Sequence, residues 1–169
     1  MIPTNSNEND VISWEDVKEI VETGRLELLH RNKSDQLKYC EFKAKMTQKY
    51  GTIDNYLYQV VLKWPKDSPL NDSGSSQEYF SSKTSSTHYN LRLNDFPYTI
   101  DSSISHYVLW SKLPFRDPND YNTKNDIDLF LKENFPGEKE WLFFINPPQI
   151  QSIKTIWHGH IFVRDIPKI

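Results

Sequence analysis

The segment IWHGHIFV, residues 156–163, is the most informative part of the sequence for the architecture. Its β-branched and aromatic residues are typical of a buried strand. Residues two apart in a strand point to the same face, so His158 and His160 are expected side by side on one surface of the sheet. Gly159 faces the other way and leaves room there for close packing. The sequence therefore predicts a final strand that carries a histidine pair.

Further strands and one helix precede this stretch. Alternating or compact apolar runs predict strands at residues 89–93, 106–110 and 141–145. A helix beginning near Asp126 and ending before Pro136 lies between the last two of these runs. Turn-forming residues separate the strands, which favours a mostly antiparallel sheet.

Three helices are expected in the N-terminal part. Ser13 begins the first and Gly24 ends it. The second begins near Ser34 and ends at Gly51, with Cys40 on a stripe expected to be buried. Thr52 caps a third helix that Pro65 closes. The predicted fold class is α+β, a helical layer followed by the sheet.

The domain organisation expected from the length of 169 residues is a single domain, residues 11–169. Residues 1–10 contain almost nothing to bury and are interpreted as a disordered tail. Residues 66–88 are rich in serine and are expected to form a surface loop or a flap over a site.

Charge and composition exclude several classes of function. The formal net charge is −3, which argues against a sequence-blind nucleic-acid binder or a protein that binds anionic membranes. No apolar run reaches the ~20 residues that cross a bilayer, and the polar N-terminus does not resemble a targeting peptide. One cysteine excludes an internal disulfide framework. A cytoplasmic protein is expected.

The histidines lead the candidate functional residues. His106, in a predicted strand, joins His158 and His160. A His-x-His pair in a strand can ligate a metal, handle an anionic phosphate or have no function, and all three readings stay open. Several other side chains each have a structural reading as a turn-former, a core ring or an exposed charge, beside a ligand-binding one: Asn94, Asp95, Trp110, Lys112, Asn146, Ser152 and Arg164.

Residues 90–165 resemble the histidine-triad (HIT) superfamily of nucleotide hydrolases and transferases. The resemblance rests on the spacing of His106 and Lys112, on Asn146, on Gln151-Ser152, and on the pair of histidines in the last strand. The Gln-Ser lies about three residues too far upstream and lacks its glycine. If His158 holds the first triad position, the third is Phe162; if it holds the second, the first is Ile156.

The HIT resemblance implies an α+β fold with a HIT-like sheet and roles for the candidate residues. His158 or His160 would be the nucleophile and its partner would support the phosphoryl oxygens, with His106 positioning or protonating. Phosphate would be bound by Lys112, Asn146, Ser152 and Arg164. A homodimer is implied by analogy only.

Almost the whole chain, residues 14–164, resembles a fungal family of uncharacterised domains that includes the N-acetylglucosamine-induced protein of yeasts. The matching landmarks extend from the segment 13–16 through Asn94-Asp95-Phe96-Pro97-Tyr98 and residues 106–112 to His158-Gly-His160. Thr99 stands where this family is expected to have glycine. The induction link implies an amino-sugar or nucleotide-sugar ligand.

Three functions remain open at this stage. The first is a HIT-like protein that binds a nucleotide, nucleotide-sugar or amino-sugar phosphate and acts on it through a histidine as a phosphohydrolase or nucleotidyl transferase. The second is a non-catalytic binding or regulatory protein linked to the N-acetylglucosamine response. The third is a metal-dependent enzyme with a tris-histidine site. The expected partner is a small phosphorylated ligand, with no nucleic acid, membrane or cofactor.

Overall fold

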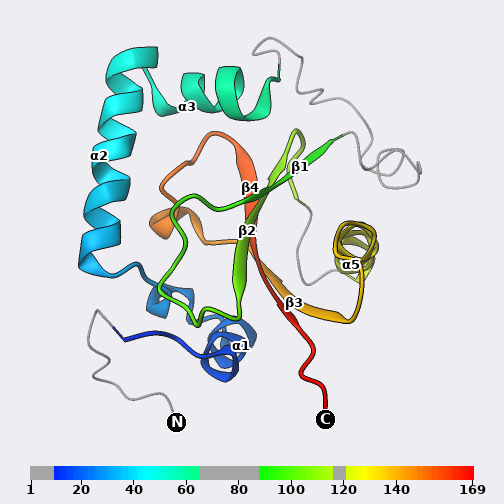
Figure 1. The fold of residues 1–169 in the computed structure, drawn as a ribbon. Coiled ribbons are helices and arrows are strands. Elements are labelled where there is room, and N and C mark those ends of the chain that lie inside the picture. Colours follow the sequence, from blue (N-terminus) through cyan, green and yellow to red (C-terminus); the bar gives the residue numbers. More distant parts are fainter. Residues whose placement is uncertain (1–9, 65–87, 116–120) are drawn as a thin grey trace.

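The structure is a computed structural model that describes residues 10–64, 88–115 and 121–169 (Figure 1). The expected tail and serine-rich loop lie almost entirely outside the described residues, as does Pro65. Within the described residues no helix is long and apolar enough to span a membrane.

A four-stranded antiparallel sheet forms the centre of the molecule. Its strands are β1 (Tyr89–Leu93), β2 (Ser105–Ser111), β3 (Lys139–Phe144) and β4 (Trp157–Asp165). They lie in the order β1-β2-β4-β3, and each neighbouring pair is antiparallel. The α+β class and the antiparallel sheet are thereby confirmed. The central position of β4 places the two histidines of this strand inside the fold.

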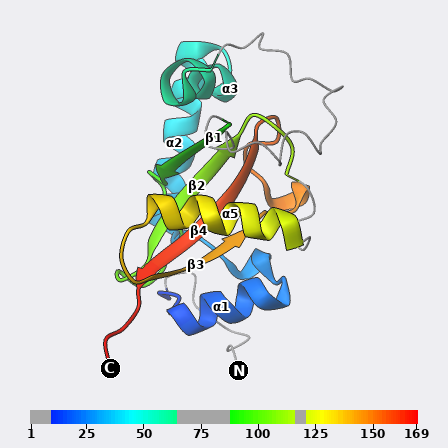
Figure 2. The ribbon, with the colours of Figure 1, turned by 90° about the vertical axis from the view of Figure 1, so that its right-hand side faces the viewer.

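One face of the sheet is covered by helix α5 (Tyr121–Asn134), which crosses the strands in Figure 2. The helix starts several residues earlier than Asp126. Its apolar residues pack on the inward-facing side chains of β2 and β4 in one cluster: Leu109, Ile127, Phe130, Leu131, Phe135, Ile161 and Val163. The part of this sheet face that lies under α5 is therefore an apolar packing interface.

The opposite face carries the histidines and is covered by the N-terminal helices (Figure 1). Helix α1 (Trp14–Thr23) packs at one end, where Trp14 joins Phe144 and Phe162. The short helix α3 (Ile53–Tyr56) and the π-helical segment Leu57–Leu62 pack at the other end, against Val108 and Trp110. Because the two apolar clusters are separate, the polar side chains lie between them.

The helix ends follow the expected chemistry with one shift. The Ser13 side chain accepts a hydrogen bond from the Asp16 amide at the start of α1, and Gly24 ends it at φ 70°. Helix α2 (Lys33–Tyr50) begins before Ser34, because Asn32 is the residue whose side chain caps it. Cys40 is exposed, so the expectation of a buried thiol is wrong. Its stripe lies on the side of α2 that carries exposed Leu37 and Ala44.

Candidate functional site

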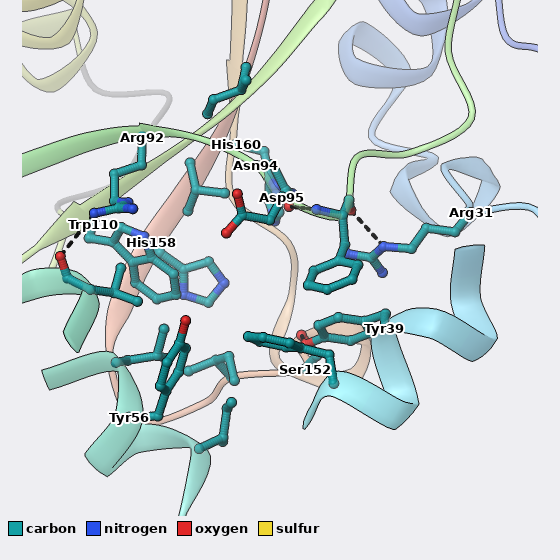
Figure 3. A pocket seen from close by; sticks show the side chains of 18 residues that line it. Arg31, Tyr39, Tyr56, Arg92, Asn94, Asp95, Trp110, Ser152, His158 and His160 are labelled. Carbon is teal, nitrogen blue, oxygen red and sulfur yellow. Dashed lines mark hydrogen bonds between the residues drawn. The ribbon is translucent and has the colours of Figure 1, made fainter. Parts of the chain in front are cut away.

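An open pocket lies between the histidine face of the sheet and helices α2 and α3 (Figure 3). It encloses about 730 Å³ of space free of protein atoms, part of it open to solvent. Aromatic rings form much of its wall: Tyr39, Phe42, Tyr56, Phe96 and Trp110. An apolar wall with a few polar groups is the ordinary composition of a small-molecule site.

His158 presents one ring nitrogen to this pocket. Its Nδ1 lies 2.8 Å from the carbonyl oxygen of Ile156, an acceptor, so Nδ1 carries the proton and donates. Among the described residues, Nε2 has no hydrogen-bond partner, and Figure 3 shows the ring projecting toward the centre of the pocket. Burial lowers the pKa of His158, and the bond to Ile156 opposes this in part. His158 is therefore a neutral imidazole with a free lone pair.

His106 and His160 form a buried pair, with His160 in the wall of the pocket and His106 behind it. The Tyr98 amide donates to Nδ1 of His106 at 3.2 Å, so the His106 proton is on Nε2. That Nε2 lies 2.9 Å from Nδ1 of His160, and the His160 proton is in turn on Nε2. Burial, with a contribution from Arg31, lowers the pKa of His106 to about 3. Burial, and then the neighbouring His106 and His158, lowers the pKa of His160 well below its usual value. Both rings are neutral at physiological pH.

Asn146 ends this chain of hydrogen bonds. Its Nδ2 lies 3.2 Å from Nε2 of His160 and 2.9 Å from the Tyr98 hydroxyl, and its Oδ1 is buried without a partner among the described residues. Since His160 Nε2 carries a proton, it needs an acceptor. If the amide of Asn146 is turned by 180°, its Oδ1 accepts from both His160 Nε2 and the Tyr98 hydroxyl. Its Nδ2 is then the buried group without a partner among the described residues. Both nitrogens of His160 are thus used inside the protein.

Two arginines bring positive charge to the pocket. Arg31 donates from Nε to the carbonyl oxygen of Phe96 at 2.7 Å, and its guanidinium carbon lies 4.4 Å from the ring centre of Tyr39 and 5.2 Å from that of Tyr98. Arg92 donates from Nη1 to the carbonyl oxygen of Val61 at 3.0 Å. In the described part of the chain, no carboxylate lies within ion-pair distance of either guanidinium.

The other two described arginines are paired. Arg25 lies 2.9 Å from Glu19, and Arg164 lies 2.6 Å from Glu140. Among the described arginines, the two that line the pocket are therefore the ones without a carboxylate within ion-pair distance.

The structure brings six of the ten expected site residues to the pocket wall: Asn94, Asp95, Trp110, Ser152, His158 and His160. Asn94 also has its structural role, because its side-chain oxygen accepts from the Phe96 amide in the turn. Trp110 is both a core ring and a wall of the pocket, and its centroid lies 4.9 Å from that of His158.

The other four expected residues do not line the pocket. His106 and Asn146 lie behind it, in the hydrogen-bond chain. The Lys112 ammonium lies 5.4 Å from the ring centre of Trp64. Arg164, expected as an anion ligand on the face of His160, instead binds Glu140 and Glu15 and lies over the ring of Trp14. Arg164 lies on the same face of β4 as His160, as expected, but helix α1 packs over that end of the strand.

A tris-histidine metal site gains no support. Within the described ranges no group of three or more histidine, cysteine, aspartate or glutamate side chains could hold a metal ion. The physical reason is the contact between His106 and His160, whose facing nitrogens are engaged with each other.

Comparison with known proteins places the chain in a family. Residues 13–164 match the family model described as a protein of unknown function, DUF3605. The chain belongs to the DUF3605 family. This confirms the resemblance to a fungal family of uncharacterised domains, and the match covers every residue of the pocket wall.

Relatives of this DUF3605 chain come from yeasts. It is 32% identical to the uncharacterized protein YPL067C of Saccharomyces cerevisiae, over 89% of this chain and 77% of that protein. It is 27% identical to N-acetylglucosamine-induced protein 1 of Candida albicans, over 97% of this chain and 72% of that protein. A crystal structure of HTC1 superposes with a TM-score of 0.65 at 31% identity, covering 92% of this chain and 86% of that one.

Sequence reasoning missed several pocket residues of this DUF3605 protein. Arg31 and Tyr39 lie on α2 or just before it, and Tyr56 lies on α3. Arg92 lies on β1 opposite Val108 and so shares the histidine face. The period-2 pattern of β1 carried a signal for Arg92, whereas the docking of α2 and α3 over the sheet is a tertiary contact that no local pattern encodes.

Proposed function

We propose that this pocket binds a phosphorylated small molecule of the nucleotide, nucleotide-sugar or amino-sugar phosphate class. The observation that carries the proposal is the pair of arginines, Arg31 and Arg92, which line the pocket without a carboxylate partner among the described residues. Guanidinium groups bind phosphate in bidentate fashion and lose little rotamer entropy when they are already held in place. Arg31 is held in this way by Phe96 and two tyrosine rings.

Two further observations support this class of ligand. The aromatic wall offers apolar area beside the cations, which suits the non-phosphate part of such a molecule. The name of the Candida relative records induction by N-acetylglucosamine, which makes amino-sugar derivatives reasonable members of the test panel.

A second candidate function adds catalysis, and the free Nε2 of His158 favours it. In this reaction Nε2 attacks the phosphorus of the ligand, and the bond from phosphorus to the leaving oxygen breaks. The leaving oxygen keeps the electron pair and takes a proton from water. A water molecule then attacks the phosphorus and gives its proton to the hydroxide left by the first step, the N–P bond breaks with its electron pair returning to Nε2, and the histidine is again neutral. This assigns His158 to the middle position of a HIT-like triad, with Ile156 in the first position and His160 in the third.

Ligand binding is tested by isothermal titration of the full chain with nucleotides, nucleotide-sugars and amino-sugar phosphates. Arg31→Gln and Arg92→Gln are each expected to weaken binding by about 10-fold or more, because each removes a charged hydrogen bond. Arg25→Gln is the matched control, since Arg25 is paired with Glu19 away from the pocket. Absence of binding by every member of the panel, or equal affinity in the pocket variants and the control, overturns the proposal.

Catalysis is tested separately by following phosphate release from any ligand that binds. His158→Ala is expected to abolish release, and the histidine adduct is expected to be detectable by mass spectrometry after rapid quenching. Binding without turnover in the natural protein rejects the catalytic candidate and leaves the binding proposal in place.

A further inference from the structure

The pocket has two polar sets of side chains with different charge, and Figure 3 shows Arg31 and Arg92 on opposite sides of His158. At one end Arg31 and Ser152 are joined through Tyr39, whose ring lies under the guanidinium and whose hydroxyl lies 2.7 Å from Ser152 Oγ. The second polar set consists of Arg92 and Tyr56 on the other side of the pocket, together with Asp95, which Figure 3 shows nearer the centre, above the ring of His158. The first end is cationic, whereas the second contains one positive and one negative side chain.

The cationic end suits a phosphate group. Tyr39 donates to Ser152 Oγ, so the hydrogen of the Ser152 hydroxyl remains to be donated to an anion beside the fixed guanidinium. Lys43 adds a second positive charge nearby, because its ammonium donates to the carbonyl oxygen of Ser152 at 3.2 Å. No carboxylate within ion-pair distance offsets Arg31 or Lys43 among the described residues.

The second end suits neutral groups that both donate and accept hydrogen bonds. An ionised carboxylate only accepts and a guanidinium only donates, so a ligand that satisfies Asp95 and Arg92 together needs both functions. The nearness of this set to Tyr56 is seen in the pKa of the phenol, which burial and then Asp95 raise and Arg92 lowers. Hydroxyl groups have both functions, and adjacent hydroxyls of a sugar ring can engage both side chains.

Neighbouring rings of the aromatic wall between the two ends are inclined to one another. Where rings of the wall contact one another in the described residues, their planes are inclined by 37° to 78°: Tyr39 with Phe96, Phe42 with Tyr56 and with Phe96, Trp110 with His158, and His158 with His160. A flat nucleobase is held best between parallel faces. Inclined rings make a rounded apolar surface, which fits a puckered ring better.

The geometry points to a sugar phosphate as the ligand, with its phosphate at Arg31 and Ser152 and its hydroxyl groups at Asp95 and Arg92. This inference rests on the proposed function and narrows it, since it selects a phosphorylated monosaccharide over a nucleotide. It also sets the direction of the ligand, with the ring of the sugar beside the free nitrogen of His158.

The test is titration of the full chain with three probes: glucosamine 6-phosphate, AMP and inorganic phosphate. The sugar phosphate is expected to bind at least about 10-fold more tightly than either of the others. Asp95→Asn is expected to weaken the sugar phosphate by about 10-fold and to leave inorganic phosphate unchanged. Arg31→Gln is expected to weaken the binding of all three probes. Arg31→Lys keeps the positive charge and is expected to bind with an affinity between those of Arg31→Gln and the natural protein.

The controls are Asp165→Asn and Arg25→Gln, which change residues paired outside the pocket. The inference is overturned if AMP binds more tightly than the sugar phosphate, or if the Asp95→Asn protein binds the sugar phosphate as tightly as the natural protein does. In either case the proposed function still holds if binding depends on Arg31. If no probe binds at all, both fail. Asp95 is exposed, so its substitution tests the site with little effect on folding.

Discussion

Nε2 of His106 lies 2.9 Å from Nδ1 of His160, and the two rings share one proton in a hydrogen bond within the sheet. The proton belongs to His106, because the Tyr98 amide already donates to the other nitrogen of that ring. This single contact separates the roles of the three histidines. The ring nitrogens of His106 and His160 are all engaged inside the protein, whereas His158 presents a nitrogen without a partner among the described residues to the pocket.

The tautomers of the three histidines are expected to differ. His158 should carry its proton on Nδ1, and His106 and His160 should carry theirs on Nε2. Long-range ¹⁵N–¹H correlation spectra at pH 7.5 distinguish the two forms for each ring. A spectrum with His160 protonated on Nδ1 contradicts the assigned direction of the hydrogen-bond chain and the turned amide of Asn146.

Stability is expected to rise with pH between about pH 3 and pH 6.5. Burial, and then Arg31, lowers the pKa of His106 to about 3, so in this range the unfolded chain binds a proton that the folded chain does not. His160 acts in the same direction. When the pH is lowered from 6.5 to 5.5, these two histidines together should reduce the free energy of unfolding by about 2 kcal/mol. Urea unfolding at several pH values measures this, and a flat profile contradicts it.

His106→Ala is expected to destabilise the fold strongly. The substitution leaves a cavity beside Phe162 and deprives His160 Nδ1 of its donor, which together should cost about 2–4 kcal/mol. His158→Ala should cost less, because that ring faces the pocket and makes one hydrogen bond to the backbone. Equilibrium denaturation of both variants gives the comparison. Equal losses would show that the His106–His160 contact contributes nothing particular.

Gly159→Ala is expected to destabilise the sheet by about 1–3 kcal/mol. A Cβ at this position would lie 2.7 Å from Cζ of Phe143 and closer still to Cε2. Phe143→Leu removes the ring edge, so the double variant should lose less stability than the sum of the two single variants. Additive losses in this double-mutant cycle would mean that the clash is relieved elsewhere.

Local patterns predicted much of the fold. The strands around His106 and His158 followed from β-branched and aromatic runs, and the caps of α1 and α3 from Ser13 and Thr52. These features depend on neighbouring residues alone. The same reasoning placed His158 and His160 on one face and left Gly159 on the other, as the structure has them.

The remaining features depend on contacts between distant segments. Trp157 is the first residue of β4 and is 49% exposed, although the strand pattern alone is that of a buried strand. Arg164 was expected among the anion ligands, and Glu140 from the neighbouring strand engages it instead. Arg31 reaches the pocket only because α2 docks across the sheet. Such pairings are fixed by the tertiary fold, which a single sequence does not display.

The contact between Gly159 and Phe143 ties the chemistry of one side of the sheet to the packing of the other. The phenylalanine ring presses on the backbone midway between His158 and His160, from the side that α5 covers. A change in the size of that ring would move the segment that bears both imidazoles, and would do so without altering any group that a ligand touches. Variants selected for altered ligand preference should therefore include substitutions in the closed apolar layer, remote from the opening.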